Sequence, residues 1–367
     1  MIQTLQLLAF CLSIGFIGCM KNPPTAADGS ATLVILTRWD TTAGLAKPVY
    51  MPMPNAKITL GSEYGISMRQ ADGFGTLIVS ALPTSIYSIT VRAPHPVDPN
   101  IIIVGSISGL MVGAQATIVD TIFGSPISSS GISINEIYAV GPVNNFFYFF
   151  DQFIELYNAS DEVKYVDGMI IMRVSGNNEG LGPGADEGND GDIDGVTYAF
   201  KFPGSPGEKN HPFYPKQFLV LAVDAVDHRK SISTSYDLSN ANWEFYNQFS
   251  AEDIDNPSVS NLINIRSDRT VDFLYGLTGD VIVLASGKDS SWVDGIDIST
   301  VVDAVEYQSS PHPTNKKTLD SRIDRSYVLS PPRYSGQSMQ RREPGLDTND
   351  GLVDFEIIPR ATPGKQK

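Results

Sequence analysis

The sequence lacks the residue patterns that most enzyme chemistry requires. None of its four histidines stands in a His-x-x-x-His or His-Glu-x-x-His spacing, so the common zinc hydrolase motifs are absent. It contains neither a Gly-x-Ser-x-Gly nucleophile motif nor a glycine-rich phosphate loop before a helix. Paired carboxylates of the glycosidase type stay open, because their spacing is set in three dimensions. A non-catalytic protein is the favoured interpretation.

Positive charge is also scarce. The 367 residues include 26 Lys and Arg against 41 Asp and Glu, which gives a formal net charge of −15. Phosphate binding needs clustered cations, so no nucleic acid partner is expected. The one concentration of arginines, within residues 322–342, is interleaved with acidic residues and favours ion pairs inside a domain. Apolar residues make up 42% of the chain, which is enough for a core.

No apolar run in the N-terminal region is long enough to span a membrane. The run from Leu5 to Ile17 has 13 residues, whereas a spanning helix needs about 20. Its length fits the hydrophobic part of a secretion signal. Gly18 and Cys19 follow, and then a polar stretch begins at Lys21. This pattern resembles the lipobox of bacterial lipoproteins, which implies cleavage before Cys19 and acylation of its thiol and new amine.

The chain has only two cysteines, and this shortage supports the lipoprotein interpretation. Cys11 lies inside the predicted signal peptide, residues 1–18, so the mature chain keeps Cys19 alone and forms no internal disulfide. Stability must then come from core burial. The alternative is a buried free cysteine beside an apolar N-terminus. Residues 19–30, rich in Pro, Ala and Thr, are predicted to be a lipidated tether.

Residues 31–130 show the alternation of half-buried strands. Ala56, Ile58 and Leu60 alternate with polar residues, and a second alternating run carries Tyr87, Ile89 and Val91. Between the two runs lie a turn at Asp72-Gly73 and a Leu82-Pro83 step into the next strand. This string resembles the carboxypeptidase regulatory-like β-sandwich of the transthyretin type. Modules of that family are generally non-catalytic.

From residue 131 the sequence changes to an ordered series of short motifs. Ile154 and Leu156 alternate with Glu155, which predicts a strand with one buried face, whereas the run from Phe218 to Val223 predicts a central strand. The other motifs are Ile132 to Ile137, Val166-Asp167-Gly168, Gly336 to Arg341, Asp347 to Gly351 and Thr362-Pro363-Gly364. The series resembles the lamin-tail domain, an immunoglobulin-like β-sandwich. The resemblance spans residues 131–367 and implies an enlarged domain with insertions at about 177–195 and about 224–270.

The first insertion contains a candidate calcium loop. Asp190, Asp192 and Asp194 alternate before a glycine, which is the opening of an EF-hand-like loop. Position twelve of the motif is Lys201 instead of a bidentate glutamate, so other acids, such as Asp186, Glu187, Asp350 or Asp354, would have to complete the site. The alternative is a solvated acidic turn. No cofactor is certain, and calcium is the candidate ion.

The second insertion contains four aromatic residues within seven positions. Trp243 and Tyr246 are three residues apart, and Ser239 or Asn240 can cap a helix, which predicts that the two rings share a helical face. Aromatics on an inserted loop are typical of binding surfaces, and we assign Trp243 and Tyr246 as candidate binding residues. The competing interpretation, that these rings attach the loop to its own domain, is the favoured one.

The predicted fold class is all-β, with two β-sandwich modules behind a lipoprotein signal. This plan resembles an uncharacterised lipoprotein family of Bacteroidetes outer membranes. The resemblance implies a lipid-anchored location at the outer membrane, facing the periplasm or the cell surface. We predict a non-catalytic binding or scaffold protein, either an accessory subunit of an outer-membrane assembly or an adhesin, with an envelope protein or polysaccharide as partner. The alternative is a surface hydrolase or carbohydrate-binding accessory protein that uses carboxylates of the C-terminal domain.

Overall fold

The chain folds almost entirely into β-strands, which confirms the predicted all-β class. The structure, a computed structural model, describes residues 29–42, 47–98, 101–174, 190–309, 317–319, 323–324 and 326–367. The predicted signal peptide, Cys19 and residues 177–189 of the acidic insertion lie outside the described residues. No helix in the described part of the chain is long and apolar enough to cross a membrane.

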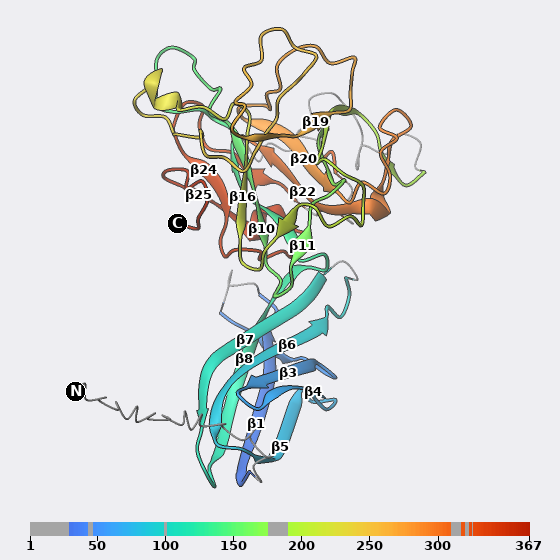
Figure 1. Ribbon diagram of the computed structural model, residues 1–367, viewed down its shortest axis with the longest axis vertical. Coiled ribbons are helices and arrows are strands. Elements are labelled where there is room, and N and C mark those ends of the chain that lie inside the picture. The colour runs from blue at the N-terminus through green and yellow to red at the C-terminus, as the bar shows by residue number, and fades with distance from the viewer. Residues whose placement is uncertain are drawn as a thin grey trace, which may run out of the picture.

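The first body of the molecule is one eight-stranded sheet, drawn in blue and teal in the lower half of Figure 1. Its strands follow the order β2-β1-β8-β7-β6-β3-β4, and β5 also pairs with β1. The strands are β1 (Ala31–Asp40), β2 (Tyr50–Pro52), β3 (Lys57–Ser62), β4 (Gly65–Gln70), β5 (Thr76–Leu82), β6 (Ser85–Pro94), β7 (Ile101–Val112) and β8 (Thr117–Ser128).

This sheet folds over on itself to enclose a core. Leu33 of β1 belongs to the same buried cluster as Ile58 and Leu60 of β3 and Ile89 of β6. Along β3 and β6 the buried and accessible residues alternate as predicted, because one face of each strand packs against this core. The apolar alternation of the sequence therefore identifies the inner faces correctly.

The second body contains two main sheets, of seven and six strands, that pack face to face. One has the order β18-β17-β16-β10-β9-β24-β25, and the other has the order β19-β14-β12-β20-β22-β23. The strands of the first are β18 (Ser260–Asn261), β17 (Trp243–Glu244), β16 (Phe218–Ala222), β10 (Phe153–Asn158), β9 (Ile132–Tyr138), β24 (Ser338–Arg341) and β25 (Phe355–Ile358). Those of the second are β19 (Ile263–Asn264), β14 (Val196–Lys201), β12 (Ile170–Val174), β20 (Gly279–Ala285), β22 (Val301–Gln308) and β23 (Val328–Leu329).

Short elements complete this body. Two small ladders pair β11 (Lys164–Tyr165) with β15 (Pro212–Phe213) and β13 (Asp192–Ile193) with β21 (Ile296–Asp297). The helical elements that the structure describes are the 3₁₀ turns η3 (His228–Lys230) and η4 (Ile298–Thr300) and the single turn α1 (Gly351–Asp354).

Both large sheets are buried on both faces. Leu156 and Leu221 of the seven-stranded sheet meet Phe200 and Leu284 of the six-stranded sheet in the central core. The outer face of the seven-stranded sheet is covered by side chains of the 224–270 insertion, and the outer face of the six-stranded sheet carries a further buried cluster. The long loops thus bury strand faces, which explains why β16 is apolar on both sides.

Glu155 differs from the sequence prediction, because the face of β10 that carries it is buried as well. The C-terminal residues cover this face. Gly364 N–H donates to Glu155 Oε2 at 2.6 Å, and Thr362 N–H donates to Glu136 Oε1 at 3.1 Å. Burial, followed by the charge of Glu136, raises the pKa of Glu155 to about 8. The motifs at residues 132–137 and 362–364, at opposite ends of the second body's sequence, therefore bind each other.

The helix predicted around Trp243 is wrong. Residues 239–249 contain the short strand β17 instead, which pairs in parallel with β16 through Leu221 and Trp243. Asn242 starts the pairing, because its N–H donates to the carbonyl of Val220 and its Oδ1 accepts the N–H of Val220. Pairing with β16 and β18 satisfies the backbone N–H and C=O groups of this segment and also joins it to the sheet, which a local helix would not do.

A fully buried arginine joins the strands near the C-terminus. The guanidinium of Arg341 lies 2.8 Å from Asp303 Oδ2 and 3.2 Å from Asp354 Oδ2, and it also donates to the carbonyls of Ile134 and Leu346. This arginine is one of those in the predicted ion-paired run. Asp354, which was a candidate to complete the calcium loop, faces Arg341 instead.

The two bodies contact each other directly. Ile127 of β8 packs against Tyr157 and Ala159 of the second body, and Asp347 N–H donates to the carbonyl of Pro126 at 3.0 Å. Strand β1 runs parallel to β8, with Thr32 opposite Thr117. Since β8 ends at the junction with the second body, β1 begins at the far end of the first body, about 40 Å away for a twelve-residue strand.

Candidate functional site

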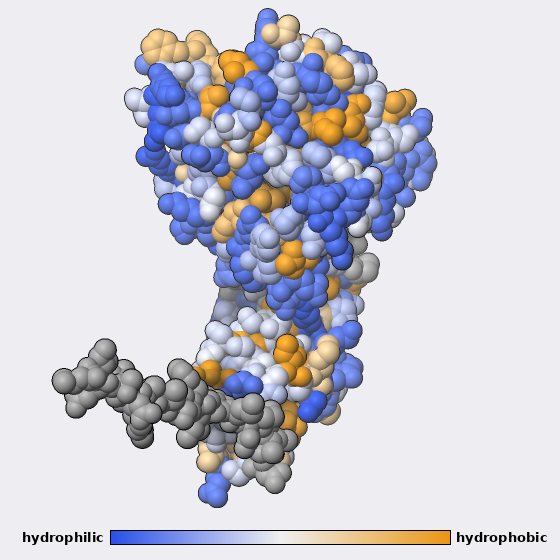
Figure 2. Space-filling view, in the orientation of Figure 1, coloured by the Kyte–Doolittle hydropathy of each residue, from blue (hydrophilic) through white to orange (hydrophobic). Residues whose placement is uncertain are grey.

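The loop between β9 and β10 presents a cluster of aromatic side chains to solvent. We call residues 142–150 the aromatic loop; it contains Phe146, Phe147, Tyr148, Phe149 and Phe150 in succession. Phe146 is 80% exposed and Phe147 is 74% exposed. The loop lies at the end of the second body that points away from the first, at the upper left of Figure 1. Figure 2 shows apolar residues gathered at the same place.

Hydrogen bonds hold the aromatic loop in one conformation. Asn144 Oδ1 accepts the N–H groups of Phe146 and Tyr148, and Asn144 Nδ2 donates to the carbonyl of Tyr148. Phe147 has a positive φ of 58°, which a bulky residue rarely adopts, and its ring packs edge-on against Tyr334. The exposed phenylalanines are therefore displayed on a fixed backbone.

A histidine connects the aromatic loop to the 224–270 insertion. The Tyr148 hydroxyl lies 2.5 Å from His228 Nδ1, and His228 Nε2 lies 2.9 Å from the carbonyl oxygen of Asp224. A carbonyl oxygen can only accept, so Nε2 carries a proton and donates it. Burial lowers the pKa of His228, which favours the neutral ring, and Nδ1 then accepts the tyrosine proton.

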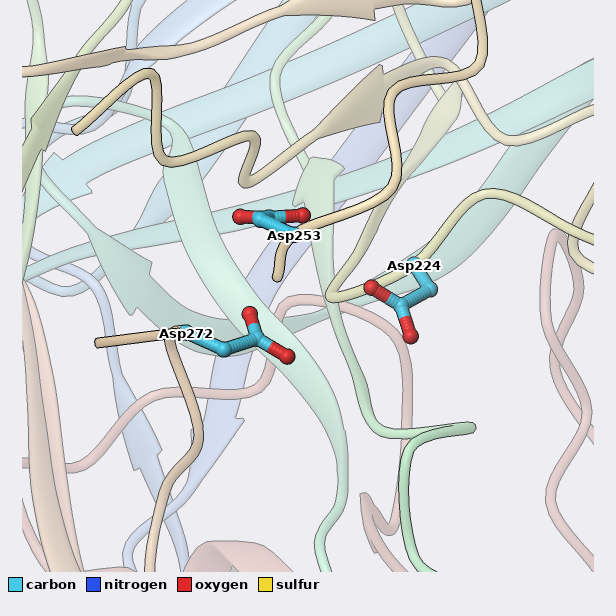
Figure 3. A group of neighbouring side chains, drawn as sticks. All are labelled: Asp224, Asp253 and Asp272. Atoms are coloured by element: carbon cyan, nitrogen blue, oxygen red, sulfur yellow. The ribbon is translucent and has the colours of Figure 1, made fainter. Parts of the chain in front are cut away.

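Three carboxylates meet near the start of the 224–270 insertion. One of them belongs to Asp224, whose carbonyl oxygen also contacts His228. Asp224, Asp253 and Asp272 each place an oxygen within 4.8 Å of the other two. Figure 3 shows that they reach this common space from three separate stretches of chain. Asp224 follows β16, Asp253 lies in the middle of the insertion, and Asp272 lies just beyond its predicted end. We call these residues the carboxylate cluster.

The carboxylate cluster is poorly compensated by its surroundings. Asp253 Oδ2 accepts the N–H of Asn247, but Asp253 Oδ1 and Asp272 Oδ1 are buried with no donor except each other's carboxyl group. Burial, followed by the charges of Asp272 and Asp253, raises the pKa of Asp224 to about 8. Burial and the charge of Asp253 raise the pKa of Asp272 to about 7. Two ionised groups about 4 Å apart repel by about 4 kcal/mol at an effective dielectric constant of 20, so the cluster needs a shared proton or a cation.

The predicted binding residues lie apart from the aromatic loop. Trp243 is only 6% exposed and packs edge-on against Phe202 and His211 in the central core. Tyr246 is half-buried next to Phe245, which is fully buried. Trp243 thus occupies the position expected for a ring that attaches the inserted segment to its own domain.

The predicted calcium loop is only partly described. Asp192 lies in β13, where it pairs with Asp297 of β21, and the two line a cavity of about 450 Å³ together with Asp190. Burial and the neighbouring acids raise the pKa of Asp192. Within the described residues, Asp190, Asp192 and Asp194 do not form a group of carboxylate oxygens within 4.8 Å of one another. Calcium binding by this loop stays a prediction.

Sequence reasoning missed both the aromatic loop and the carboxylate cluster. Five successive aromatic residues after Asn144 and Asn145 were a visible signal, but such a run is equally typical of a buried strand. The three aspartates of the cluster had no local signal, because about 30 and 20 residues separate them along the chain.

Comparisons with known proteins support the fold and leave the activity open. A family model described as "Protein of unknown function (DUF4876)" matches residues 214–294, the stretch that contains the whole carboxylate cluster. None of the curated proteins matches the chain in sequence. The crystal structure of a DUF4876 family protein from Bacteroides thetaiotaomicron VPI-5482 matches with a TM-score of 0.58 and 19% identity, over 89% of this chain and 94% of the other. The two chains share a fold.

A second solved structure is more distant. It belongs to a protein from Bacteroides uniformis ATCC 8492 described as a "putative carbohydrate binding protein". The TM-score is 0.20 and the identity 12%, with 40% of this chain and 60% of the other covered.

Proposed function

We propose that the chain is a lipid-anchored, non-catalytic binding protein of the bacterial outer membrane, and that its aromatic loop docks on a protein partner in the envelope. The observation that carries the proposal is the pair of exposed phenylalanines, Phe146 and Phe147, on a hydrogen-bonded loop. Each phenylalanine that is buried in an interface contributes about 2 kcal/mol or more, and aromatic residues are enriched among the residues that dominate binding.

The chemistry of the loop favours a protein over a polysaccharide. Val143 and Phe150 are exposed beside the two phenylalanines, and Asn145 adds one exposed amide, so the surface is mainly apolar and offers few side-chain hydrogen-bond groups for sugar hydroxyls. A rigid apolar projection fits an apolar pocket of a protein, because little conformational entropy is lost when it binds. The outer-membrane assembly predicted from the sequence is a partner of this kind.

The position where the N-terminal segment enters the first body is compatible with an anchor at Cys19. A tether of residues 19–30 would join the first body where β1 begins, at the end distant from the second body. The aromatic loop lies at the opposite end of the molecule, in the second body (Figure 1). A lipid at Cys19 would therefore place the aromatic loop away from the membrane surface that holds the lipid.

The carboxylate cluster gives little support to the hydrolase alternative. Paired catalytic carboxylates of glycosidases are about 5 to 9.5 Å apart, which leaves room for a sugar bond or a water molecule. In the cluster, three acids instead of two share one space, and their nearest oxygens lie within 4.8 Å of one another. This crowding suits a shared proton or cation better than two separate acid and base roles.

Crosslinking in cells followed by mass spectrometry tests the proposal. The lipidated wild-type protein is compared with the double variant Phe146→Ser/Phe147→Ser and with the control Ile66→Ser/Met68→Ser, which changes two equally exposed residues on β4 of the first body. We expect a recurring envelope protein to be lost from the phenylalanine variant, by about 30-fold or more, and kept by the control. Equal recovery from all three proteins would refute the aromatic loop as the docking surface.

A further inference from the structure

We propose that Asp224, Asp253 and Asp272 bind one Ca²⁺ ion. This site differs from the loop that the sequence predicted, and it lies in the second insertion rather than the first. Each of the three side chains supplies an oxygen within 4.8 Å of the other two. Oxygens on one Ca²⁺ ion lie about 2.3 to 2.6 Å from it, so two ligands on opposite sides are separated by about 4.6 to 5.2 Å. An ion between the three oxygens can therefore contact all three carboxylates with side-chain shifts of no more than about half an ångström.

A second observation points to a ligand at this position. Asp224 is 9% exposed, and its carboxylate makes no hydrogen bond or ion pair in the described part of the chain, although it faces Asp253 and Asp272 (Figure 3). A buried carboxylate without a partner is costly, and it is normally paired or bound to a metal. The buried Oδ1 atoms of Asp253 and Asp272 have no donor except each other's carboxyl group, and a cation can replace the proton that such a pair would share. Each carboxylate thus has an oxygen available for a cation.

Further acids add to the negative charge at the cluster. Glu244 acts on Asp224, Glu252 acts on Asp272, and Asp255 acts on Asp253, and each of these acids disfavours a further negative charge. No ion pair between described residues involves a member of the cluster. Glu244 itself is occupied, because its carboxylate accepts the N–H groups of Ala225 and Asn256. A divalent cation supplies the charge that the protein does not.

The donor set selects among metals. Three carboxylates are hard oxygen ligands, and the described residues place no histidine or cysteine side-chain atom in the group, which disfavours zinc. Mg²⁺ requires near-octahedral geometry, keeps several water molecules and is usually held by one or two carboxylates, whereas this cluster offers three. Ca²⁺ accepts longer distances and irregular coordination, and water molecules can fill its remaining positions.

The ion would hold together three distant parts of the second body. Asp224 leaves β16, Asp253 lies near the middle of the insertion, and Asp272 precedes the buried Phe273. Binding would fix the start of the segment that carries His228, and hence the support of Tyr148 in the aromatic loop. The inference does not depend on what the aromatic loop binds.

Calorimetric titration of the metal-stripped mature chain with CaCl₂, together with thermal melting, tests the site. We expect one Ca²⁺ per chain and a rise in melting temperature of roughly 5 °C at a hundredfold excess over Kd. Asp224→Asn should abolish both effects. In chelator the same variant should melt above the wild type, because it removes one of three mutually repelling charges without changing the side-chain volume. A variant that merely fails to fold would melt lower.

The matched control is Asp192→Asn, which changes the acidic loop of the first insertion. This variant should keep the full response to Ca²⁺. The inference is overturned if millimolar Ca²⁺ gives neither heat nor a change in melting temperature, or if Asp192→Asn loses the response and Asp224→Asn keeps it. It is also overturned if Asp224→Asn melts below the wild type in chelator. Loss of Ca²⁺ binding without loss of the crosslinked partner would leave the proposed function intact.

Discussion

Replacing Arg341 with methionine should destabilise the second body more than most single substitutions. The guanidinium lies 2.8 Å from Asp303 Oδ2 and 3.2 Å from Asp354 Oδ2, and all three side chains are buried. Methionine fills similar space but leaves these two carboxylates and that of Asp347, which lies 3.8 Å from the guanidinium, without a cation. It also frees the carbonyls of Ile134 and Leu346. Removing one partner of a buried ion pair costs about 3 to 5 kcal/mol, a large fraction of the roughly 5 to 15 kcal/mol that stabilises a domain.

The pH dependence of this loss separates the electrostatic cause from simple loss of packing. Burial raises the pKa of Asp303 and of Asp354 to about 7, although Arg341 opposes the rise in both. Without Arg341 both pKa values rise further, so the folded variant binds more protons than the unfolded chain over a wider pH range. Stability is then lost as the pH rises from the unfolded pKa toward the raised folded pKa. The variant should lose most at pH 8 and clearly less near pH 5.

Urea unfolding at both pH values, followed by circular dichroism and tryptophan fluorescence, measures the loss. Adding Asp303→Asn to the Arg341→Met variant should recover part of the stability at pH 8, because it removes one of the unpaired charges. A loss below about 1 kcal/mol at pH 8, or a larger loss at pH 5 than at pH 8, would refute the buried ion network as a stabilising element.

Three further outcomes follow from the structure. Glu155 and Asp224 have pKa values raised to about 8, so the folded protein binds more protons than the unfolded chain between pH 5 and pH 8. The unfolding free energy in chelator should therefore fall over this range, and melting temperatures that rise over it would contradict the expectation. Deleting residues 362–367 removes the hydrogen bonds that cover Glu155 and should cost about 2 to 4 kcal/mol by urea unfolding, and an unchanged midpoint would show that the tail is dispensable. Cys19→Ala should abolish labelling with an alkyne fatty acid and release the protein from the membrane fraction; continued labelling would place the lipid elsewhere.

The strands were predictable where the signal was local. The alternation of Ile58 and Leu60 with polar residues identifies the inner face of β3, because side chains in a strand point to opposite sides in turn. The same rule assigned Glu155 to an accessible face. The C-terminal residues that bury it are about 200 positions away, so no local pattern could reveal the cover.

The functional candidates were the least predictable part of the molecule. Trp243 has the appearance of a binding residue in the sequence, but pairing of β17 with β16 turns it into the core. Phe146 has the appearance of a core residue, but the hydrogen bonds of Asn144 hold its loop outward. In both cases the exposure of the ring depends on contacts that the folded chain makes, and these contacts cannot be predicted from the aromatic residues alone.

A site-specific photocrosslink tests the central proposal most directly. A photoreactive amino acid at position 146 of the lipidated protein should yield, on irradiated cells, one dominant adduct with an envelope protein. The same amino acid at position 68, an equally exposed site on β4 of the first body, should not yield it. Absence of an adduct at position 146, or the same adduct at both positions, would contradict the proposal that the aromatic loop is the docking surface.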